Sequence, residues 1–392
     1  MSHWPISPAS EIGPRGGGLW TRWMERLERY FSDPARYDRV RSFALTRWMA
    51  RRRTQQLMGV MTGFVQSQVL LLCVRMKLFE LLAREPMDLG ALARLLSYQE
   101  GPLRCVLESA VSLKLLRRDP SGLYTLGELA HPVLGHAGIR AMVEHNQLLY
   151  RDLADPEAFL RAGGKGHMAA YWPYAQEEGA QPAMQPEAQG QSAAYSELMD
   201  ASQNFVIAEV LDSFAFDRHR CVLDIGCGKG RFASELAKRW PDLQLHVLDL
   251  PHVMSLTRQR LCEAGLAGRT SFHGRSFLGE PLPRGADLCT LIRVAHDHPD
   301  HVVQALFQQI YQALPAGGRL LLAEPMALAA QGAAQGAREA DPYFHFYMLA
   351  MGQGRLRSVG ELSAMLQKSG FSAVETVPTA MPIHAQILLA SK

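Results

Sequence analysis

Two kinds of hydrophobic pattern divide the chain. Between Val60 and Leu134, apolar residues recur at the three- and four-residue spacing of amphipathic helices. This region predicts three helices and then a short strand pair, an order that is typical of a winged-helix-like unit. The helices are expected at residues 63–82, 89–95 and 102–116, and a strand at 123–126 follows the Pro/Gly turn at 119–122.

A different pattern begins at residue 221, where short apolar runs alternate with amphipathic helices. The alternation predicts a parallel sheet covered by helices on both faces, so the expected fold class is α/β with a Rossmann-like sheet. The last two strands have no helix between them and are expected to form an antiparallel hairpin. Strands are predicted at 221–226, 244–250, 270–274, 286–294, 318–324, 373–378 and 384–390, and helices at 230–240, 252–265, 300–314 and 358–370.

These patterns divide the chain into four segments. A basic and aromatic extension covers residues 1–57, and the mainly helical unit covers 58–135. A helical connector follows at 136–210, and the α/β domain covers 211–392. The connector contains a stretch at 175–194 that is rich in Gln, Ala, Gly and Pro and is expected to be a loop.

Arginine and tryptophan are concentrated in the extension between residues 19 and 57. Two interpretations stay open. The segment is either a solvated helix whose aromatic side chains pack on the body, or an amphipathic helix that lies on a membrane surface.

The overall composition gives no sign of a charged partner. The 392 residues are 47% hydrophobic and 20% charged, and the net charge is only +3. The predicted helix 102–116 would be the DNA-reading helix of a winged-helix regulator, but it is mostly apolar and carries Glu108 in its middle. We therefore expect no nucleic-acid partner and expect this helix to pack, including against a second subunit.

The cysteines and the apolar runs favour a cytoplasmic protein that is soluble or peripheral to a membrane. None of the six cysteines forms a Cys-x-x-Cys pair or groups with histidines at zinc-site spacing, so we expect reduced thiols and no metal. The N-terminus shows no secretory signal pattern. The longest apolar-rich run, residues 69–74, is far too short to span a bilayer and is followed by Arg75 and Lys77.

A glycine-rich turn follows the first strand of the α/β domain. The strand runs into Gly226-Cys-Gly-Lys-Gly230, and a helix begins directly afterwards. Glycines let the backbone turn sharply and approach a ligand at the carboxyl end of a strand. Arg231 stands where a dinucleotide fingerprint has its third glycine, and no Gly-Lys-Ser/Thr follows, so the turn favours neither NAD nor a phosphate loop.

The second strand ends in Asp249, at the distance where an acidic side chain meets a ribose. A carboxylate can accept hydrogen bonds from both ribose hydroxyls of an adenosine cofactor. The alternative is that Asp249 only caps the helix that follows. With the glycine turn upstream, the ribose role is favoured.

These residues resemble the class I S-adenosylmethionine (SAM) methyltransferases over 221–392. The stretch from about 58 to 392 resembles the O-methyltransferase family that includes plant phenolic and hydroxyindole enzymes. The marks are the glycine turn, Asp249-Leu-Pro, Ser276-Phe277, Arg293-Val-Ala-His-Asp and Leu322-Ala-Glu324. The resemblance implies a homodimer that uses SAM without a metal. It also implies cofactor contacts from Gly226, Gly228, Asp249, Leu250, Ser276, Phe277 and Arg293.

The same resemblance implies the catalytic residues. The family's base is a histidine just beyond the fourth strand, which falls on His296, and Glu324 at the end of the next strand would orient its ring. His298 is an immediate competitor for the role of base. It stands where the family has tryptophan, and Leu356 stands where the plant enzymes have a second orienting glutamate. Ser276 likewise replaces the aspartate that the family often places beside the adenine.

An aromatic and methionine-rich segment lies near residue 347. Its residues recur at helical spacing, which suits either a packed core or a long apolar slot for a polyene. It resembles, together with the stretches around 149–156 and 171–174, a bacterial branch of the family that methylates hydroxycarotenoids. The predicted pocket residues are Tyr343, Tyr347, Met348, Met351 and Asn146, with His145 and Tyr150 as weaker candidates.

The predicted function is therefore transfer of the SAM methyl group to a hydroxyl of an apolar acceptor, with a 1-hydroxycarotenoid favoured. Three alternatives stay open. One is methylation of carbon or oxygen in another apolar or phenolic small molecule. The second is a SAM-sensing winged-helix regulator, and the third is a non-catalytic dimerising scaffold. A membrane-dissolved acceptor would give the basic extension a role at the lipid surface.

Overall fold

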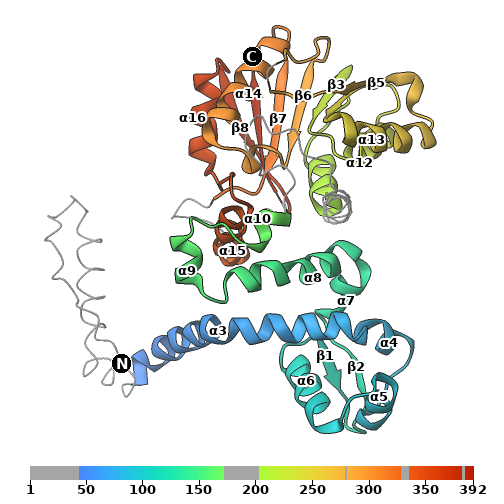
Figure 1. Cartoon of the computed structure of the whole chain (residues 1–392), viewed down its shortest axis with the longest axis vertical. Helices are drawn as coiled ribbons and strands as arrows, with labels where there is room; N and C mark the ends of the chain where they lie inside the picture. Colours follow the sequence, from blue (N-terminus) through green and yellow to red (C-terminus); the bar gives the residue numbers. More distant parts are fainter. Residues whose placement is uncertain (1–43, 172–202, 279, 328–334, 382–384) are drawn as a thin grey trace, which may run out of the picture.

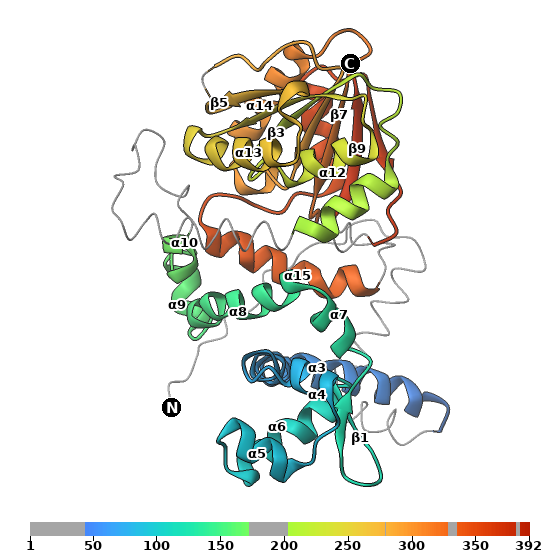
Figure 2. The same cartoon turned by 90° about the vertical axis from the view of Figure 1, so that its right-hand side faces the viewer.

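The computed structural model describes residues 44–171, 203–278, 280–327, 335–381 and 385–392. In these parts of the chain, a helical N-terminal unit and an α/β body are separated by a layer of helices (Figures 1 and 2). Most of the predicted extension and all of the predicted loop 175–194 lie outside the described residues.

The N-terminal unit contains one more helix than its pattern predicted. The single helix expected at 63–82 is two helices, α3 (Ala44–Arg75) and α4 (Leu78–Arg84), and the first starts well before the prediction. The break falls at Lys77, whose φ of 53° is left-handed and ends the α-helical run. This change of direction carries Leu78 and Phe79 into the core of the unit, where both are fully buried.

The rest of the unit follows the predicted order. Helices α5 (Leu89–Leu96) and α6 (Glu100–Ser112) are followed by the antiparallel strands β1 (Leu116–Arg118) and β2 (Tyr124–Leu126). Helix α6 ends earlier than expected, because the left-handed Lys114 turns the chain into β1. Its apolar residues Leu103, Leu107 and Ala110 are buried, so the helix packs inward.

A layer of helices joins the two bodies. It is formed by α7 (Ala130–Gly135), α8 (Ala137–Asp152), α9 (Pro156–Arg161) and α10 (His167–Tyr171), together with α15 (Gln335–Met351) from near the end of the chain. Helix α15 contacts α8 and α10 and lies under the sheet in both views (Figures 1 and 2).

The α/β body is the predicted Rossmann-like sheet. Its strand order is β5-β4-β3-β6-β7-β9-β8. The strands are β3 (Cys221–Ile225), β4 (Gln244–Asp249), β5 (Thr270–Gly274), β6 (Leu288–Ile292), β7 (Arg319–Glu324), β8 (Ala373–Val377) and β9 (Gln386–Ser391). The antiparallel pairing of the last two strands is confirmed, but β9 also inserts between β7 and β8 and pairs antiparallel with both.

Helices cover both faces of the sheet, as the alternating pattern predicted. Helices α12 (Arg231–Arg239) and α13 (Pro251–Glu263) pack in one apolar cluster on one face. Helices α14 (Asp300–Ala313) and α16 (Val359–Lys368) pack in a second cluster on the other face. The α/β fold class is therefore confirmed.

The parallel register places the candidate chemistry at one edge. Strands β3, β4, β6 and β7 run in the same direction, and their carboxyl ends are Ile225, Asp249, Ile292 and Glu324. Ligands bind in open α/β sheets at this edge. The loops that follow these strands are therefore the place to search for a site.

Candidate active site

The glycine turn after β3 has backbone conformations that require its glycines. Gly226, Gly228 and Gly230 have φ values of 70°, 53° and 73°, a region that other residues rarely adopt. A Cβ at Gly226 would lie 2.6 Å from a methyl of Val294, so this glycine permits close packing. A Cβ at Gly228 would have no neighbour within 4 Å, which leaves open space beside the middle of the turn.

Asp249 holds the glycine turn in place. Its Oδ2 accepts a hydrogen bond from the backbone N–H of Gly228 at 2.8 Å, and its Oδ1 accepts one from Leu250 at 2.7 Å. Leu250 is the N-cap residue of α13, and no side chain caps the first turn of that helix, so the contact from Asp249 stops at the N-cap residue. Burial raises the pKa of Asp249 to about 6, although both backbone donors oppose the shift. Each oxygen retains a lone pair for a further donor.

Asp224, inside β3, is a polar residue that the sequence analysis missed. Its Oδ1 accepts a hydrogen bond from the hydroxyl of Thr290 at 2.8 Å, whereas its buried Oδ2 has no hydrogen-bond partner among the described residues. Burial, with a smaller contribution from the nearby Asp249, raises the pKa of this carboxyl to about 7. An acidic residue within an apolar strand was the available signal. The orphaned oxygen suits a cationic or hydrogen-donating ligand.

Glu324 organises the turn after β6. Its Oε1 accepts hydrogen bonds from the backbone N–H groups of Val294 and Ala295 at 2.9 and 2.7 Å. Its Oε2 contacts Nδ1 of His296, which lies in the short 3₁₀ helix η2 (Ala295–Asp297). A carboxylate oxygen is an acceptor, so Nδ1 donates to Oε2 and the neutral imidazole keeps its lone pair on Nε2. The structure thus brings the two predicted catalytic residues together.

Asp297 is a second carboxylate beside the imidazole. Its Oδ1 lies 3.2 Å from Nε2 of His296. Burial disfavours the imidazolium, but Asp297 and Glu324 together outweigh burial and raise the pKa of His296 above its usual value. Burial also raises the pKa of Asp297 itself. Asp297 follows His296 directly in a sequence motif, but adjacency in sequence does not show which ring nitrogen its carboxylate faces.

His298, the competing base, has a different environment. Burial, and then the neighbouring His296, lower its pKa to about 4. Its ring is nearly perpendicular to that of Phe277, with centroids 5.3 Å apart. No hydrogen bond to a carboxylate orients it in the described residues, so the geometry favours His296 as the base.

The remaining predicted cofactor residues lie along the same edge. Ser276 follows β5, and its hydroxyl accepts a hydrogen bond from the backbone N–H of Leu278 at 3.0 Å. Arg293 directly follows β6 with a left-handed φ of 55°, and its positive charge opposes protonation of His296. Their contacts with a cofactor stay predictions.

The aromatic segment forms helix α15, which contacts η2. Tyr347, Met348 and Met351 are almost fully buried in a cluster with residues of α8, α9 and α10. The Tyr343 hydroxyl donates to Oδ1 of Asn146 at 2.9 Å, and the Tyr347 hydroxyl lies 3.1 Å from Nε2 of His145. These polar groups join α15 to α8, so they serve helix packing. Their role as a pocket wall stays a prediction.

The family of the chain follows from comparison with known proteins. A family model of the O-methyltransferase domain matches residues 150–372, and a model of the O-methyltransferase dimerisation domain matches residues 58–135. The chain therefore belongs to the O-methyltransferase family, and the resemblance noted in its sequence is confirmed.

Two curated relatives are similar over most of their length. Demethylspheroidene O-methyltransferase of Cereibacter sphaeroides is 39% identical over 88% of this chain and 88% of its own. The enzyme of the same name from Rhodobacter capsulatus is 38% identical over 88% of this chain and 84% of its own. The solved structure of the S-adenosylmethionine-dependent methyltransferase SibL superposes with a TM-score of 0.72 at 22% identity, covering 86% of this chain and 98% of SibL, and shows the same fold.

Asp249→Ala is expected to weaken binding of SAM. Losing two hydrogen bonds to a charged acceptor costs about 2 kcal/mol, which is roughly 30-fold in Kd. Isothermal titration calorimetry measures this change, and Asp249→Asn tests whether one remaining acceptor restores part of the affinity. The exposed Asp242→Asn, on the turn before β4, is the matched control. Equal affinity in Asp249→Ala and the control would reject the ribose assignment.

The raised pKa of His296 predicts the pH profile of methyl transfer. A base must be neutral, so kcat/KM should fall as pH decreases through a pKa above 6.5. Asp297→Asn removes one of the two carboxylates that stabilise the imidazolium and should move this acid limb to lower pH. The rate of S-adenosylhomocysteine formation between pH 5 and 9 measures it. An acid limb that stays in place in Asp297→Asn, as it should in Asp242→Asn, would contradict the assignment.

Proposed function

We propose that the chain transfers the methyl group of SAM to the hydroxyl of a 1-hydroxycarotenoid of the demethylspheroidene type. One observation carries the chemistry: the His296–Glu324 pair lies at the same sheet edge as the glycine turn and Asp249. The acceptor is supported by the two demethylspheroidene O-methyltransferases at 38 and 39% identity.

The residues at the sheet edge fit SAM. The open space beside Gly228 admits a ligand against the backbone, and Asp249 keeps lone pairs for the ribose hydroxyls. Phe277 offers an aromatic face for the adenine, and the orphaned Oδ2 of Asp224 suits the cationic methionine part. SAM, when bound, supplies a methyl group on a positively charged sulfur. No metal ligands are needed for this fit.

The protein's own residues manage the proton of the acceptor. Glu324 fixes the tautomer of His296, so Nε2 carries the lone pair that accepts the hydroxyl proton. Oδ1 of Asp297, 3.2 Å from the same nitrogen, then stabilises the imidazolium that forms. An alcohol has a pKa far above that of imidazole, so full deprotonation before attack is unfavourable, and the proton leaves late. Burial of His296 keeps water away from the reacting oxygen, and alignment of the two reactants carries most of the rate enhancement.

His296→Ala is expected to abolish most methyl transfer without changing the affinity for SAM. Losing a general base costs roughly 100- to 10,000-fold in kcat. Turnover is measured with demethylspheroidene in detergent, and cofactor affinity by calorimetry. His298→Ala is the discriminating variant, and the exposed His301→Ala is the control. Loss of turnover in His298→Ala with normal turnover in His296→Ala would assign the base to His298.

The acceptor is tested separately by mass spectrometry of the products. A methoxycarotenoid should form faster than any product from a panel of phenols. A methylated phenol together with an unmodified carotenoid would support the alternative small-molecule function. A methyl group on carbon would remove the O-methylation proposal altogether.

We further propose that the chain forms a homodimer through the exposed apolar side of α3. Val60 and Phe64 are 81% and 71% exposed, and Leu57 and Met61 extend the same stripe along the helix. An apolar stripe of this length is rarely left in water on a soluble protein. The turns from Met58 onward fall within the match to the dimerisation model, which supports a second copy as their partner.

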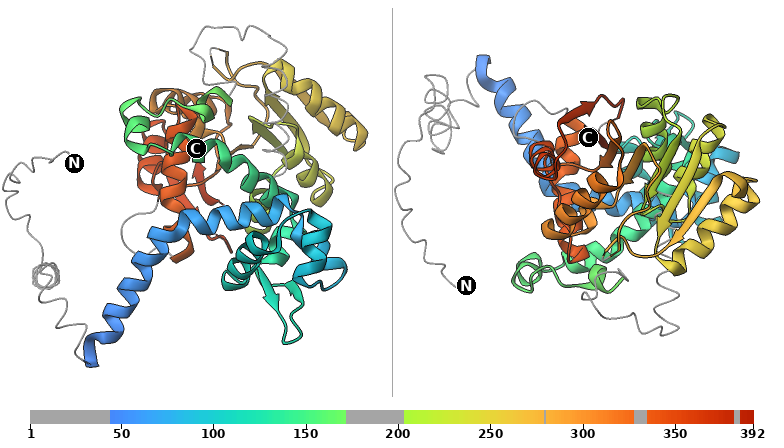
Figure 3. Two further views of the ribbon diagram at one scale, coloured as in Figure 1. Left: turned by 60° about the horizontal axis from the view of Figure 1, so that its bottom comes forward. Right: turned by 90° about the horizontal axis from the view of Figure 1, so that it is seen from above.

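The first turns of α3 have a different composition, and we assign them to an anionic lipid surface. Residues 44–79 contain no Asp or Glu, while Arg47, Arg51, Arg52 and Arg53 lie within two turns around the exposed Trp48. Arginine with tryptophan is typical of helices at a membrane interface. Figure 3 shows this end of α3 extending away from the body, where a flat surface can reach it.

A membrane-spanning role for α3 is less well supported than a surface role. By length and composition alone, Arg51–Arg75 could cross a bilayer. However, Val69, Cys73 and Val74 in its last turns are buried in the core of the N-terminal unit. A lipid contact at the first turns fits both observations. It would place the protein on the cytoplasmic face of the membrane in which the carotenoid dissolves.

Replacing Arg51, Arg52 and Arg53 together with glutamine is expected to reduce binding to vesicles of phosphatidylglycerol and phosphatidylcholine by tenfold or more. Co-sedimentation at two salt concentrations measures the binding. Neutralising the exposed Arg94, Arg104 and Arg151 in the same way is the matched control. Equal binding by the two triple variants would reject the lipid assignment. Methyl transfer to detergent-dissolved carotenoid should be unchanged in both.

A further inference from the structure

The segment between α15 and α16 packs directly against the turn that carries His296. A Cβ at Gly354 would lie 1.9 Å from the backbone oxygen of His296, so only glycine allows this approach. The backbone N–H of Ala327, beyond β7, donates to the oxygen of Arg357 at 2.9 Å. The segment is thus tied to the strand end that carries Glu324.

Arg357 is the main contact from this segment to the catalytic turn. Its side chain is almost completely buried. Nη1 donates to the backbone oxygen of Ala295 at 2.8 Å, and Nη2 donates to that of His298 at 2.7 Å. One planar guanidinium therefore binds the two carbonyl groups that flank His296 and Asp297.

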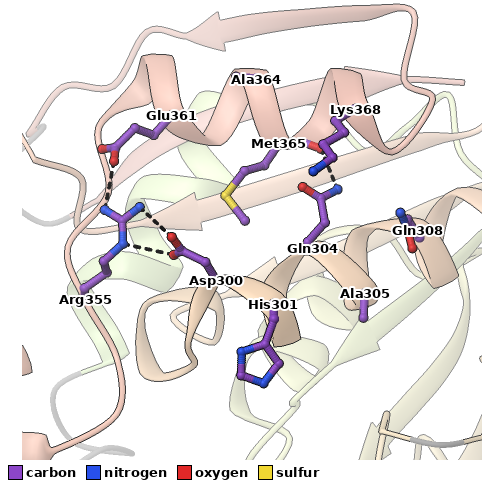
Figure 4. A pocket seen from close by; sticks show the side chains of 10 residues that line it. All are labelled: Asp300, His301, Gln304, Ala305, Gln308, Arg355, Glu361, Ala364, Met365 and Lys368. Carbon is purple, nitrogen blue, oxygen red and sulfur yellow. Dashed lines mark hydrogen bonds and ion pairs between the residues drawn. The ribbon is translucent and has the colours of Figure 1, made fainter.

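The charge of Arg357 is balanced at the edge of the same network. Nε and Nη2 of Arg357 lie 2.9 and 2.7 Å from Oδ1 of Asp300, the first residue of α14. Asp300 is held in turn by Arg355, which also contacts Glu361 (Figure 4). A buried cation is stable only when it is paired and hydrogen-bonded, and this one is. The guanidinium of Arg355, by contrast, lines an open groove of about 630 Å³, and its hydrogen-bond partners are Asp300, Glu361 and the backbone oxygen of Leu356.

Two groups from distant parts of the sequence therefore hold η2. Glu324 binds N–H groups at its start, and Arg357 binds the carbonyl groups at its start and just beyond its end. The guanidinium of arginine carries five N–H donors in one rigid plane. It therefore fixes the relative position of two carbonyl groups better than the ammonium of lysine can. With both partners present, the backbone of the turn can neither rotate nor shift along the helix axis.

We propose that Arg357 is a positioning residue that fixes the His296 turn, so that Nε2 faces the acceptor while Nδ1 stays on Glu324. It touches neither substrate nor cofactor. The inference rests on the proposed role of His296 as the base. Arg357 should therefore affect the rate of methyl transfer more than it affects the binding of SAM.

The test compares Arg357→Ala, Arg357→Lys and Arg355→Ala with the wild-type full-length protein. Loss of a group that orients a catalytic residue typically costs about 10- to 100-fold in activity. For Arg357→Ala we expect a loss of this size in kcat, calculated per binding site for S-adenosylhomocysteine (SAH). The Kd for SAM should change less than threefold. Counting sites by SAH titration removes any unfolded fraction from the comparison. Arg357→Lys should recover only part of the rate, because one ammonium cannot bind both carbonyls in the same plane.

Rescue by free guanidinium gives an independent readout. Guanidinium at a non-denaturing concentration should raise kcat of Arg357→Ala severalfold and leave Arg355→Ala unchanged. Normal kcat per site in Arg357→Ala, with His296→Ala inactive, would overturn the inference alone. Normal kcat in His296→Ala would instead overturn the proposed base. Equal rate losses in Arg357→Ala and Arg355→Ala, without rescue, would show that only the Asp300 network matters and would also reject the inference.

Discussion

The architecture of the site depends on one buried carboxylate at the end of a central strand. Glu324 accepts two backbone N–H groups of the neighbouring loop with one oxygen and the imidazole of His296 with the other. A carboxylate buried in this way is stable only while all three donors are present. The loop after β6, the strand β7 and the His296 imidazole are therefore a single unit, and none can move without leaving a buried polar group unpaired.

Other acidic groups lie at the same edge of the sheet, so carboxyl groups are concentrated there. Asp224, Asp249 and Asp297 all have raised pKa values, and burial is the largest cause for each. Folding removes these carboxyl groups from water, and the loss of their hydration costs free energy. A cationic cofactor at this edge would recover part of the cost, which gives a physical reason for a sulfonium ligand in place of an anionic nucleotide.

Much of this arrangement could be predicted from local patterns. The glycine turn, Asp249, His296 and Glu324 each follow a strand that the apolar runs located within one or two residues, and parallel strands bring their carboxyl ends together. What depends on tertiary pairing could not be predicted. Segments distant in sequence set three such features. They are the approach of Asp297 to Nε2 of His296, the burial of Arg357 between two carbonyl groups, and the burial of Met348. The break at Lys77 was missed because an apolar periodicity continues across it, although one left-handed residue ends the helix.

The position of β9 has a consequence for biosynthesis. This strand, residues 386–391, follows β7 by about 60 residues in sequence, yet it pairs with β7 along its whole length. Until those residues leave the ribosome, β7 has an unpaired edge, and the strand that carries Glu324 is supported on one side only. The glycine turn and β4 can pair earlier, because all their partners precede residue 293. In a nascent chain the glycine turn and β4 can therefore be in place first, whereas the strand that carries Glu324 gains its second neighbour only after residues 386–391 have emerged.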